Sequence, residues 1–248
     1  MHPRLLIVLS IALLTSLSAL AQDQTAPTHA TTEIHTKLVS PPNGPKQLAL
    51  TLDACSGHYD AALIDFLIEQ RIPATLFITK RWLARNAQGL EVIKAHLDLF
   101  QVENHGAQHR PAVIGEGVEV YGIPAQPDLD HVRYEVQEGA RAVEQAFGRK
   151  PHWYRGATAL YDHASMDEIQ RLGWGIAGFT LNADAGATLP REAILRRLSR
   201  ARAGDIIIAH MNKPDSATGG ALREGLAQLL AQGFVFTRLD QAELRRVC

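Results

Sequence analysis

The stretch Gln47-Leu-Ala-Leu-Thr-Leu-Asp-Ala-Cys-Ser-Gly57 decides the fold class, because it contains a short strand-like apolar run that ends at Asp53 and leads into a predicted helix. Residues 48–52 have the composition of a strand that is buried on both faces. Asp60 follows as a candidate helix N-cap, and after it comes an apolar stripe at helical spacing, at Leu63, Ile64, Leu67 and Ile68. Strand, short loop and amphipathic helix together predict one βα unit.

The same alternation continues towards the C-terminus. Further strands are predicted at residues 74–79, 97–102, 151–154, 176–181, 206–208 and 234–236. Helices are predicted at residues 82–96, 129–147, 165–172 and 222–231, and one more runs to about residue 202, with Thr188 as N-cap and Pro190 as first residue. A short helix is expected after the last strand, and residues 115–128 have the glycine and proline content of a surface insertion.

Alternating strands and helices of this kind form parallel sheets with the helices outside. About seven or eight strands are expected from this pattern. No glycine-rich phosphate loop follows the first strand. The sequence therefore favours an α/β fold with a closed or nearly closed barrel over an open dinucleotide-binding sheet.

The N-terminus has the features of a secretory signal peptide over residues 1–21, with a basic start at Arg4, an apolar stretch over residues 5–20 and a small-x-small cleavage pattern. An uncleaved membrane anchor is the alternative, but the apolar stretch is short for a bilayer-spanning helix of roughly 20 residues. Residues 22–46 are polar and contain several prolines, which predicts a flexible leader. Residues 47–248 are then expected to form one catalytic domain of a periplasmic or secreted protein.

The charge balance narrows the possible partners. The 248 residues carry a formal net charge of −1, and no basic run stands out. This argues against nucleic acid as a partner, and against a membrane surface once the signal peptide is cleaved. The two cysteines, Cys55 and Cys248, are able to pair in an oxidising compartment, but the sequence leaves this disulfide open.

Polar residues follow the predicted strands at six positions, which are Asp53, His105, His109, Arg155, Asp184 and His210. In a βα-repeat fold the carboxyl ends of the strands converge on one face, and that face is where chemistry is done. Two acidic residues, three histidines and an arginine brought together there indicate metal-assisted hydrolysis.

The pair His105 and His109 is the strongest local signal. Imidazoles at i and i+4 face one metal if the segment makes a helical turn, although this spacing also occurs by chance on surface helices. Here the pair directly follows a predicted strand and Pro111 ends the turn, which favours metal binding. Asp53 closes the first strand as a candidate general base, and the helix N-cap is its alternative role, for which Asp60 is better placed.

The other three residues have structural alternatives as well. Arg155 follows two aromatic residues and is expected either to pair with Asp53 and orient it or to lie on the surface. His210 ends an Ile-rich strand, so it is either an acid for a leaving amine or a histidine with a backbone partner. Asp184 either favours the protonated form of His210 or only forms the Asn-Ala-Asp-Ala-Gly turn.

The order Asp, His-x-x-x-His, Arg, Asp and hydrophobic-x-His resembles the motifs of the NodB-type polysaccharide deacetylases, also called carbohydrate esterase family four. The resemblance extends from about Gln47 to Leu239. It implies a deformed (β/α) barrel of about seven strands. It also implies removal of acetyl groups from N-acetylated sugars with a bound divalent metal, often zinc.

The resemblance assigns a role to each matching residue. Asp53 matches the base that activates water, and Arg155 matches the arginine that orients this base. His105 and His109 match the two imidazoles that bind the metal. These roles are what the resemblance implies, beyond what residue type and spacing indicate.

Three further residues match the acid side of the family's site. Asp184 matches the carboxylate that tunes the acid, His210 matches the acid itself, and Ile208 stands where a leucine usually lines the acetyl pocket. The third motif is Arg-Gly-Ala-Thr-Ala at residues 155–159 instead of Arg-Pro-Pro-Tyr-Gly, and Ala185 replaces the usual tryptophan of the fourth. The missing aromatic residues argue against a long polysaccharide groove and leave open a short or unusual amide substrate.

One departure concerns the metal site itself. The family's first motif carries a second Asp directly after the base, and that Asp ligates the metal; here the position is Ala54, which has no lone pairs to offer. Water, Asp53, Cys55 or His58 would have to complete the ligand set, and a cysteine thiolate would favour zinc. Replacing Ala54 by Asp is therefore expected to tighten metal binding, unless another group already fills the position.

The expected function is that of a secreted metal-dependent hydrolase with zinc as its cofactor. Its substrate would be an N-acetylated or O-acetylated carbohydrate of the cell envelope, such as a glycan or a peptidoglycan fragment. Two alternatives stay open: a non-catalytic barrel protein that binds glycan, and a hydrolase of small cyclic amides or formyl groups on the same fold.

Overall fold

The computed structural model describes residues 30–39 and 44–247. The expected signal peptide, residues 1–21, and Cys248 lie outside the described residues, so the disulfide with Cys248 stays a prediction. Cys55 is buried and has no disulfide partner within the described ranges. No helix of the described residues is both long and apolar enough to cross a bilayer.

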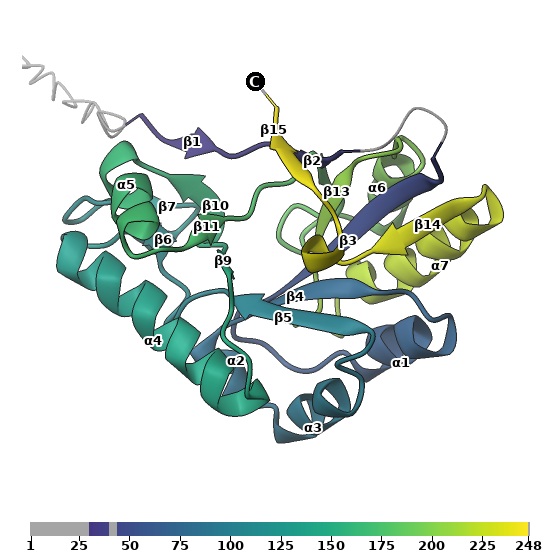
Figure 1. The fold of residues 1–248 in the computed structure, drawn as a ribbon, viewed down its shortest axis with the longest axis horizontal. Helices are drawn as coiled ribbons and strands as arrows, with labels where there is room; N and C mark the ends of the chain where they lie inside the picture. Colours follow the sequence, from purple (N-terminus) through teal and green to yellow (C-terminus); the bar gives the residue numbers. More distant parts are fainter. Residues whose placement is uncertain (1–29, 40–43, 248) are drawn as a thin grey trace, which may run out of the picture.

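A parallel sheet forms the centre of the molecule (Figure 1). Its strand order is β11-β9-β5-β4-β3-β13-β12, and β14 pairs with the start of β3. The strands are β3 (Lys46–Ala54), β4 (Ala74–Ile78), β5 (Phe100–Asn104), β9 (Trp153–Tyr154), β11 (Gly175–Ile176), β12 (Leu181–Asn182), β13 (Ile206–His210) and β14 (Phe234–Thr237). The helices are α1 (Ala61–Glu69), α2 (Lys80–Leu83), α3 (Ala87–Ala95), α4 (Leu129–Phe147), α5 (His163–Arg171), α6 (Arg191–Leu198) and α7 (Ala217–Ala231).

The stretch 175–182 connects the two ends of this sheet and curls it into a nearly closed barrel. Its first part, β11, pairs with β9, and its last part, β12, pairs with β13. The sequence predicted one strand over residues 176–181, but the middle of the stretch leaves the ladder because the carbonyls of Ala177 and Gly178 accept hydrogen bonds from the Arg155 guanidinium. The deformed barrel expected from the sequence is thus confirmed.

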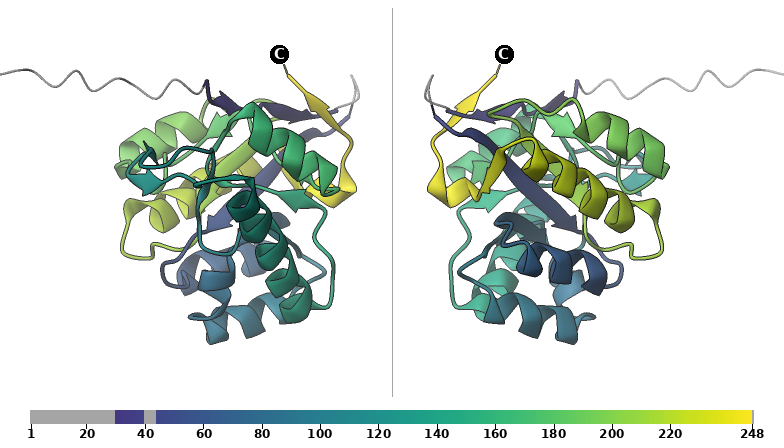
Figure 2. Two further views of the ribbon diagram at one scale, coloured as in Figure 1. Left: turned by 90° about the vertical axis from the view of Figure 1, so that its left-hand side faces the viewer. Right: turned by 90° about the vertical axis from the view of Figure 1, so that its right-hand side faces the viewer.

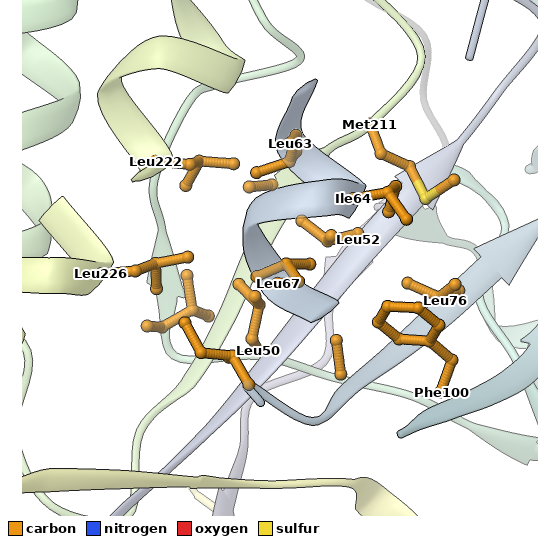
Figure 3. Close-up of a cluster of buried hydrophobic side chains, with 14 of the residues drawn as sticks. Leu50, Leu52, Leu63, Ile64, Leu67, Leu76, Phe100, Met211, Leu222 and Leu226 are labelled. Atoms are coloured by element: carbon orange, nitrogen blue, oxygen red, sulfur yellow. The ribbon is translucent and has the colours of Figure 1, made fainter. Parts of the chain in front are cut away.

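Two-residue alternation along β3 separates the helix-facing side from the barrel interior. The side chains of Leu50, Leu52 and Ala54 pack with those of α1 and α7 in the main core, whose central members Figure 3 shows. Thr51 and Asp53 point the other way and form hydrogen bonds inside the barrel. One face of β3 therefore contributes to the main hydrophobic core, and the other face lines the interior of the barrel.

Most predicted helices are present, and their ends follow local chemistry. Asp60 caps α1 by accepting the N–H of Leu63 at 3.0 Å, and α4 ends at Gly148 with a left-handed φ of 68°. The helix predicted at 82–96 is split into α2 and α3, because the Asn86 side chain bonds the Trp82 and Gly57 carbonyls. The helix predicted to run to about residue 202 ends at Leu198 as α6, and its start also differs from the prediction.

The N-cap of α6 is Pro190 rather than Thr188. The Thr188 hydroxyl instead donates to the carbonyl of Ala185 in the preceding loop, so it is not available to the helix. A short 3₁₀ turn, η1 (Leu239–Gln241), follows β14, and a strand, β15 (Leu244–Arg246), comes after it. The short C-terminal helix expected from the sequence is therefore only this single turn.

Besides β15, several short strands were missed, and all of them, except one hairpin, pair with segments far away in the chain. The missed strands are β1 (Thr32–Glu33), β2 (Thr36–Leu38), β6 (Pro111–Ala112), β10 (Ala157–Tyr161) and the hairpin β7 (Glu119–Val120) with β8 (Ile123–Pro124). β1 pairs with β10, and β2 pairs with β15 along the edge seen at the top of both views in Figure 2. The expectation of a flexible leader over residues 22–46 was wrong for β1 and β2, since Ile34 and Leu38 are buried.

Gly178 lies in the stretch 175–182 that closes the barrel, and it provides a test of how tightly this stretch packs against residues 34–36. A Cβ added there would lie 2.3 Å from the Ile34 carbonyl oxygen and 2.5 Å from the Thr36 hydroxyl. We expect Gly178→Ala to lower the free energy of unfolding by about 1–3 kcal/mol in chemical denaturation, because the backbone must shift.

The control for this substitution is Gly220→Ala on α7, where an added Cβ meets nothing within 4 Å. There the free energy of unfolding should rise by up to about 1 kcal/mol, since alanine favours the helix. Equal effects of the two substitutions would contradict the tight packing between residues 34–36 and the closing stretch.

Candidate active site

The structure brings all six predicted residues to the carboxyl ends of the strands. Asp53 is the next-to-last residue of β3, and His210 is the last of β13, directly opposite it in the ladder. His105 and Arg155 directly follow β5 and β9, and Asp184 follows β12 by two residues. His109 lies in the loop after β5, with its ring centroid 5.1 Å from that of His105.

The centre of the site is an ion pair between Arg155 and Asp53. Nη1 of Arg155 donates to Asp53 Oδ1 at 2.9 Å and to the Thr51 hydroxyl oxygen at 2.8 Å. The guanidinium is completely buried, and its Cζ lies 4.1 Å from the centroid of the Phe77 ring. Arg155 is therefore the partner of Asp53, and the alternative of a surface arginine does not hold.

This arrangement keeps Asp53 ionised. Burial by itself raises the pKa of Asp53, but the permanent positive charge of Arg155 opposes it, and protonated His105 and His210 add to this effect, so the pKa falls below its usual value. Because Oδ1 is held by Arg155, Oδ2 is the oxygen that faces the site, 3.8 Å from Nε2 of His105. A carboxylate in this state is able to accept a proton.

Cys55, rather than Ala54, faces the two histidines. Ala54 is completely buried in the core between the sheet and the helices. Cys55 is two residues after Asp53 and lies on its side of the chain, with Sγ 3.5 Å from Nε2 of His105. His58, the other substitute considered from the sequence, is exposed, and its backbone N–H donates to the Asn212 carbonyl.

The thiol of Cys55 and the two imidazoles form a group that fits a divalent metal. One ligand atom of each of Cys55, His105 and His109 lies within 4.8 Å of the other two, and tetrahedral zinc places its ligand atoms roughly 3.5 Å apart. Nδ1 of His105 is 2.6 Å from the Arg155 carbonyl oxygen, so it carries the proton and leaves Nε2 free as a ligand.

The charge state of Cys55 agrees with a ligand role. Burial raises the pKa of the Cys55 thiol, but hydrogen bonds with His105, His109 and His210 outweigh this effect, and the pKa lies well below its ordinary value. A thiolate is the form that binds metal. Two nitrogens and one sulfur leave the fourth position of a tetrahedral ion open, as catalytic zinc sites do.

Asp184 holds His210 on the other side of the site. Its carboxylate oxygens accept the backbone N–H of His210 at 2.9 Å and the ring Nδ1 at 3.0 Å, and the Thr218 hydroxyl also donates to it. Burial lowers the pKa of His210, but its hydrogen bonds with Asp184 and Cys55 outweigh burial, so the pKa lies well above the ordinary value. His210 therefore favours the imidazolium form, with Nδ1 bonded to Asp184 and Nε2 as the ring nitrogen on the side of Cys55.

The two divergent motifs have unusual backbones. Thr158 and Ala159 both have positive φ, at 67° and 55°, and the Thr158 hydroxyl has no hydrogen-bond partner in the described part of the chain. Ala159 packs with Ile208 inside the barrel. Ala185, which replaces the expected tryptophan, has a φ of 47° and donates its N–H to the Asn182 side chain.

Residues 40–177, more than half of the 248-residue chain, match the family model of the polysaccharide deacetylases. The chain belongs to the polysaccharide deacetylase family. The resemblance expected from the motifs is thereby confirmed. No curated protein matches the sequence.

Solved structures of carbohydrate esterase family four share the fold of this chain. A family pseudoenzyme from Bacillus anthracis is 22% identical with a TM-score of 0.63, and the match covers 81% of this chain and 66% of that one. A family domain of a xylanase from the hindgut metagenome of Trinervitermes trinervoides is 18% identical with a TM-score of 0.66, covering 80% and 89%. A peptidoglycan N-acetylglucosamine deacetylase is 16% identical with a TM-score of 0.65, covering 83% and 90%.

Sequence reasoning gave Cys55 no more weight than His58 as a metal ligand. A signal was present, because in an extended strand the residue two after Asp53 lies on the same face as Asp53. The hydrogen bonds of Thr51 to Arg155 and of Thr218 to Asp184 had no such signal in the sequence. Arg155 directly follows β9, and Asp184 lies in the loop before α6, so both partners are far away in the chain.

The position of the third ligand is testable with two aspartates. Ala54→Asp places a charge in the apolar core, so we expect it to lower the free energy of unfolding by several kcal/mol without tightening zinc binding, contrary to the expectation from the sequence. Cys55→Asp places the carboxylate beside the two imidazoles, so zinc should still bind. Denaturation and zinc titration of both variants check this, and tighter zinc binding by Ala54→Asp would contradict it.

Proposed function

We propose that this polysaccharide deacetylase is a metal-dependent hydrolase that removes acetyl groups from carbohydrate. The observation that carries the proposal is the grouping of Cys55, His105 and His109 beside the ionised carboxylate of Asp53. The acid side, His210 with Asp184, faces the same group through Cys55. The residues proposed as base, metal ligands and acid thus lie at one end of the barrel.

Zinc is the metal that fits this ligand set best. A soft thiolate with two imidazoles selects zinc over the hard cations, which prefer oxygen ligands. A zinc ion held there would polarise the acetyl carbonyl and make water more acidic. The residues that would hold it are Cys55, His105 and His109.

The protein's own residues account for the proton transfers. Asp53, oriented by Arg155, accepts the proton of the water that attacks the acetyl carbon. His210 donates a proton from Nε2 to the departing amine nitrogen, while its Nδ1–H stays hydrogen-bonded to Asp184. The C–N bond breaks, and acetate and the free amine leave. Asp53 and His210 then return to their starting states by proton exchange with solvent.

The substrate proposed is an N-acetylated glycan or a peptidoglycan fragment, and the location proposed is the periplasm or the outside of the cell. The proposed base and acid are little exposed, with fractions of 3% for Asp53 and 13% for the side chain of His210. We therefore expect a small acyl group to reach this centre while the sugar stays outside the barrel mouth. This favours a short acetyl group over a long acyl chain.

The direct test is acetate release by the purified protein from N-acetylglucosamine oligomers and from peptidoglycan. We expect turnover that is lost on treatment with a chelator and restored by zinc. Asp53→Asn should lower the rate by about 10²–10⁴-fold, because the base is gone, while bound zinc is kept. Elemental analysis of both proteins checks the metal.

Two other results would replace this proposal. Binding of glycan without acetate release, with or without metal, would identify a non-catalytic glycan-binding protein, a function that Ala54, in place of the family's ligating Asp, and the altered motifs allow. Zinc-dependent hydrolysis of small cyclic amides, with no activity on sugars, would identify the third candidate function.

The pKa of His210 gives a prediction for the pH dependence. Because this pKa is raised in the protein, the acid form of His210 persists above the usual range, and kcat/KM falls only when the pH rises through the raised value. Asp184→Asn removes the negative charge that raises the pKa, so the alkaline limb of the profile should move to lower pH.

The acid limb of the same profile, which reports Asp53, should keep its position in Asp184→Asn. Asp215→Asn, in the exposed loop after β13, is the matched control and should leave both limbs in place. An alkaline limb that stays unchanged in Asp184→Asn would remove His210 as the tuned acid.

A further inference from the structure

Glu135 of α4 binds the loop that carries the two histidines. Its side chain is buried, with an exposed fraction of 2%. The carboxylate accepts the N–H of Gln108 at 3.0 Å and 2.8 Å and the N–H of Arg110 at 3.0 Å. The backbone carbonyl of Glu135 accepts the N–H of Ala107 at 3.0 Å. A single residue thus holds the chain on both sides of His109.

The backbone of His109 needs such support. Its φ is 61°, a left-handed conformation that is costly for a residue with a Cβ atom. The conformation persists only if neighbouring contacts determine it. The hydrogen bonds of Gln108 and Arg110 to Glu135 are those contacts, because they flank His109 directly.

Two glycines let α4 approach the loop closely enough for these bonds. A Cβ at Gly106, whose φ is 91°, would lie 2.3 Å from Glu135 Oε1. A Cβ at Gly139, one turn further along α4, would lie 2.6 Å from the Gly106 carbonyl carbon and 2.3 Å from Asn104 Oδ1. The Asn104 side chain adds a third link, from the Gly106 N–H to the Val136 carbonyl.

We propose that Glu135 is the positioning residue of His109, and this inference rests on the proposed function. Within the described residues, the hydrogen bonds of its carboxylate go to backbone N–H groups and not to the side chains of the metal ligands. It fixes the backbone on either side of His109 and so directs the imidazole towards Cys55 and His105. Oε1 accepts from both flanking N–H groups, and Oε2 adds a second, shorter bond to Gln108.

The test is the zinc affinity of Glu135→Gln, measured by competition with a chelator of known affinity. Glutamine keeps the size of the side chain but replaces one accepting oxygen by an N–H₂ group, which repels the loop N–H groups. We expect zinc to bind about 10–100-fold more weakly, the range typical for residues that orient a metal ligand. Glu144→Gln, an exposed position on the same helix, is the control and should bind zinc like the wild type.

A second background separates positioning from general loss of structure. In His109→Ala the ligand that Glu135 positions is gone, so adding Glu135→Gln should not weaken the remaining zinc affinity further. Equal weakening in both backgrounds would overturn the inference, and so would an unchanged affinity of Glu135→Gln in the wild-type background. A wild-type protein that binds no zinc would overturn the proposed function, and this inference with it.

If Glu135→Gln does not fold, amide hydrogen exchange of the zinc-free wild type decides the question. The N–H groups of Gln108 and Arg110 should exchange far more slowly than that of Glu116 in the neighbouring surface loop. Exchange as fast as that of Glu116 would show that the loop is not held before the metal binds, and the inference would fail.

Discussion

The burial of the Arg155 guanidinium beside Asp53 is the constraint on which the rest of the structure depends. Two charges removed from water cost several kcal/mol each unless close pairing and further hydrogen bonds compensate. Here Thr51 and the carbonyls of residues 177 and 178 supply those bonds, and the ring of Phe77 covers the guanidinium. The carbonyls belong to the stretch that closes the barrel, so one interaction both curls the sheet and orients the base. Loss of one partner alone would leave a buried charge, at a cost of about 3–5 kcal/mol.

The alternation of side chains along β3 decides which residue completes the metal group. Residues 50, 52 and 54 face the helices, so Ala54 contributes to the core, and a carboxylate is not needed there. Asp53 and Cys55 face the barrel mouth together, and the cysteine brings a thiolate where the family usually has an oxygen ligand. In this chain the third candidate ligand is therefore one position further along than the Asp that ligates the metal elsewhere in the family, because residues two apart on a strand share a face.

In the proposed mechanism, two similar ion pairs have opposite tasks. In the pair of Asp53 and Arg155 the cation is permanent, so the carboxylate keeps a low pKa and remains a base. In the pair of His210 and Asp184 the carboxylate is completely buried and bonded to the chain, so the imidazole keeps its proton and remains an acid. Glu135 adds a third buried carboxylate that acts on backbone alone. The three carboxylates are chemically alike, and the group that each one binds decides its proposed role.

The sequence by itself determined the parallel strands, the helices outside them and the identity of the six polar residues at the strand ends. It succeeded because hydrophobic periodicity, the cap at Asp60 and the stop at Gly148 are local signals. Only the tertiary structure decided the pairing of β1 and β2 with distant strands, the split of the closing stretch at Gly178 and the choice of Cys55 over its neighbours. These features depend on hydrogen bonds and steric contacts between residues far apart in the chain. The local sequence around either residue does not reveal such contacts.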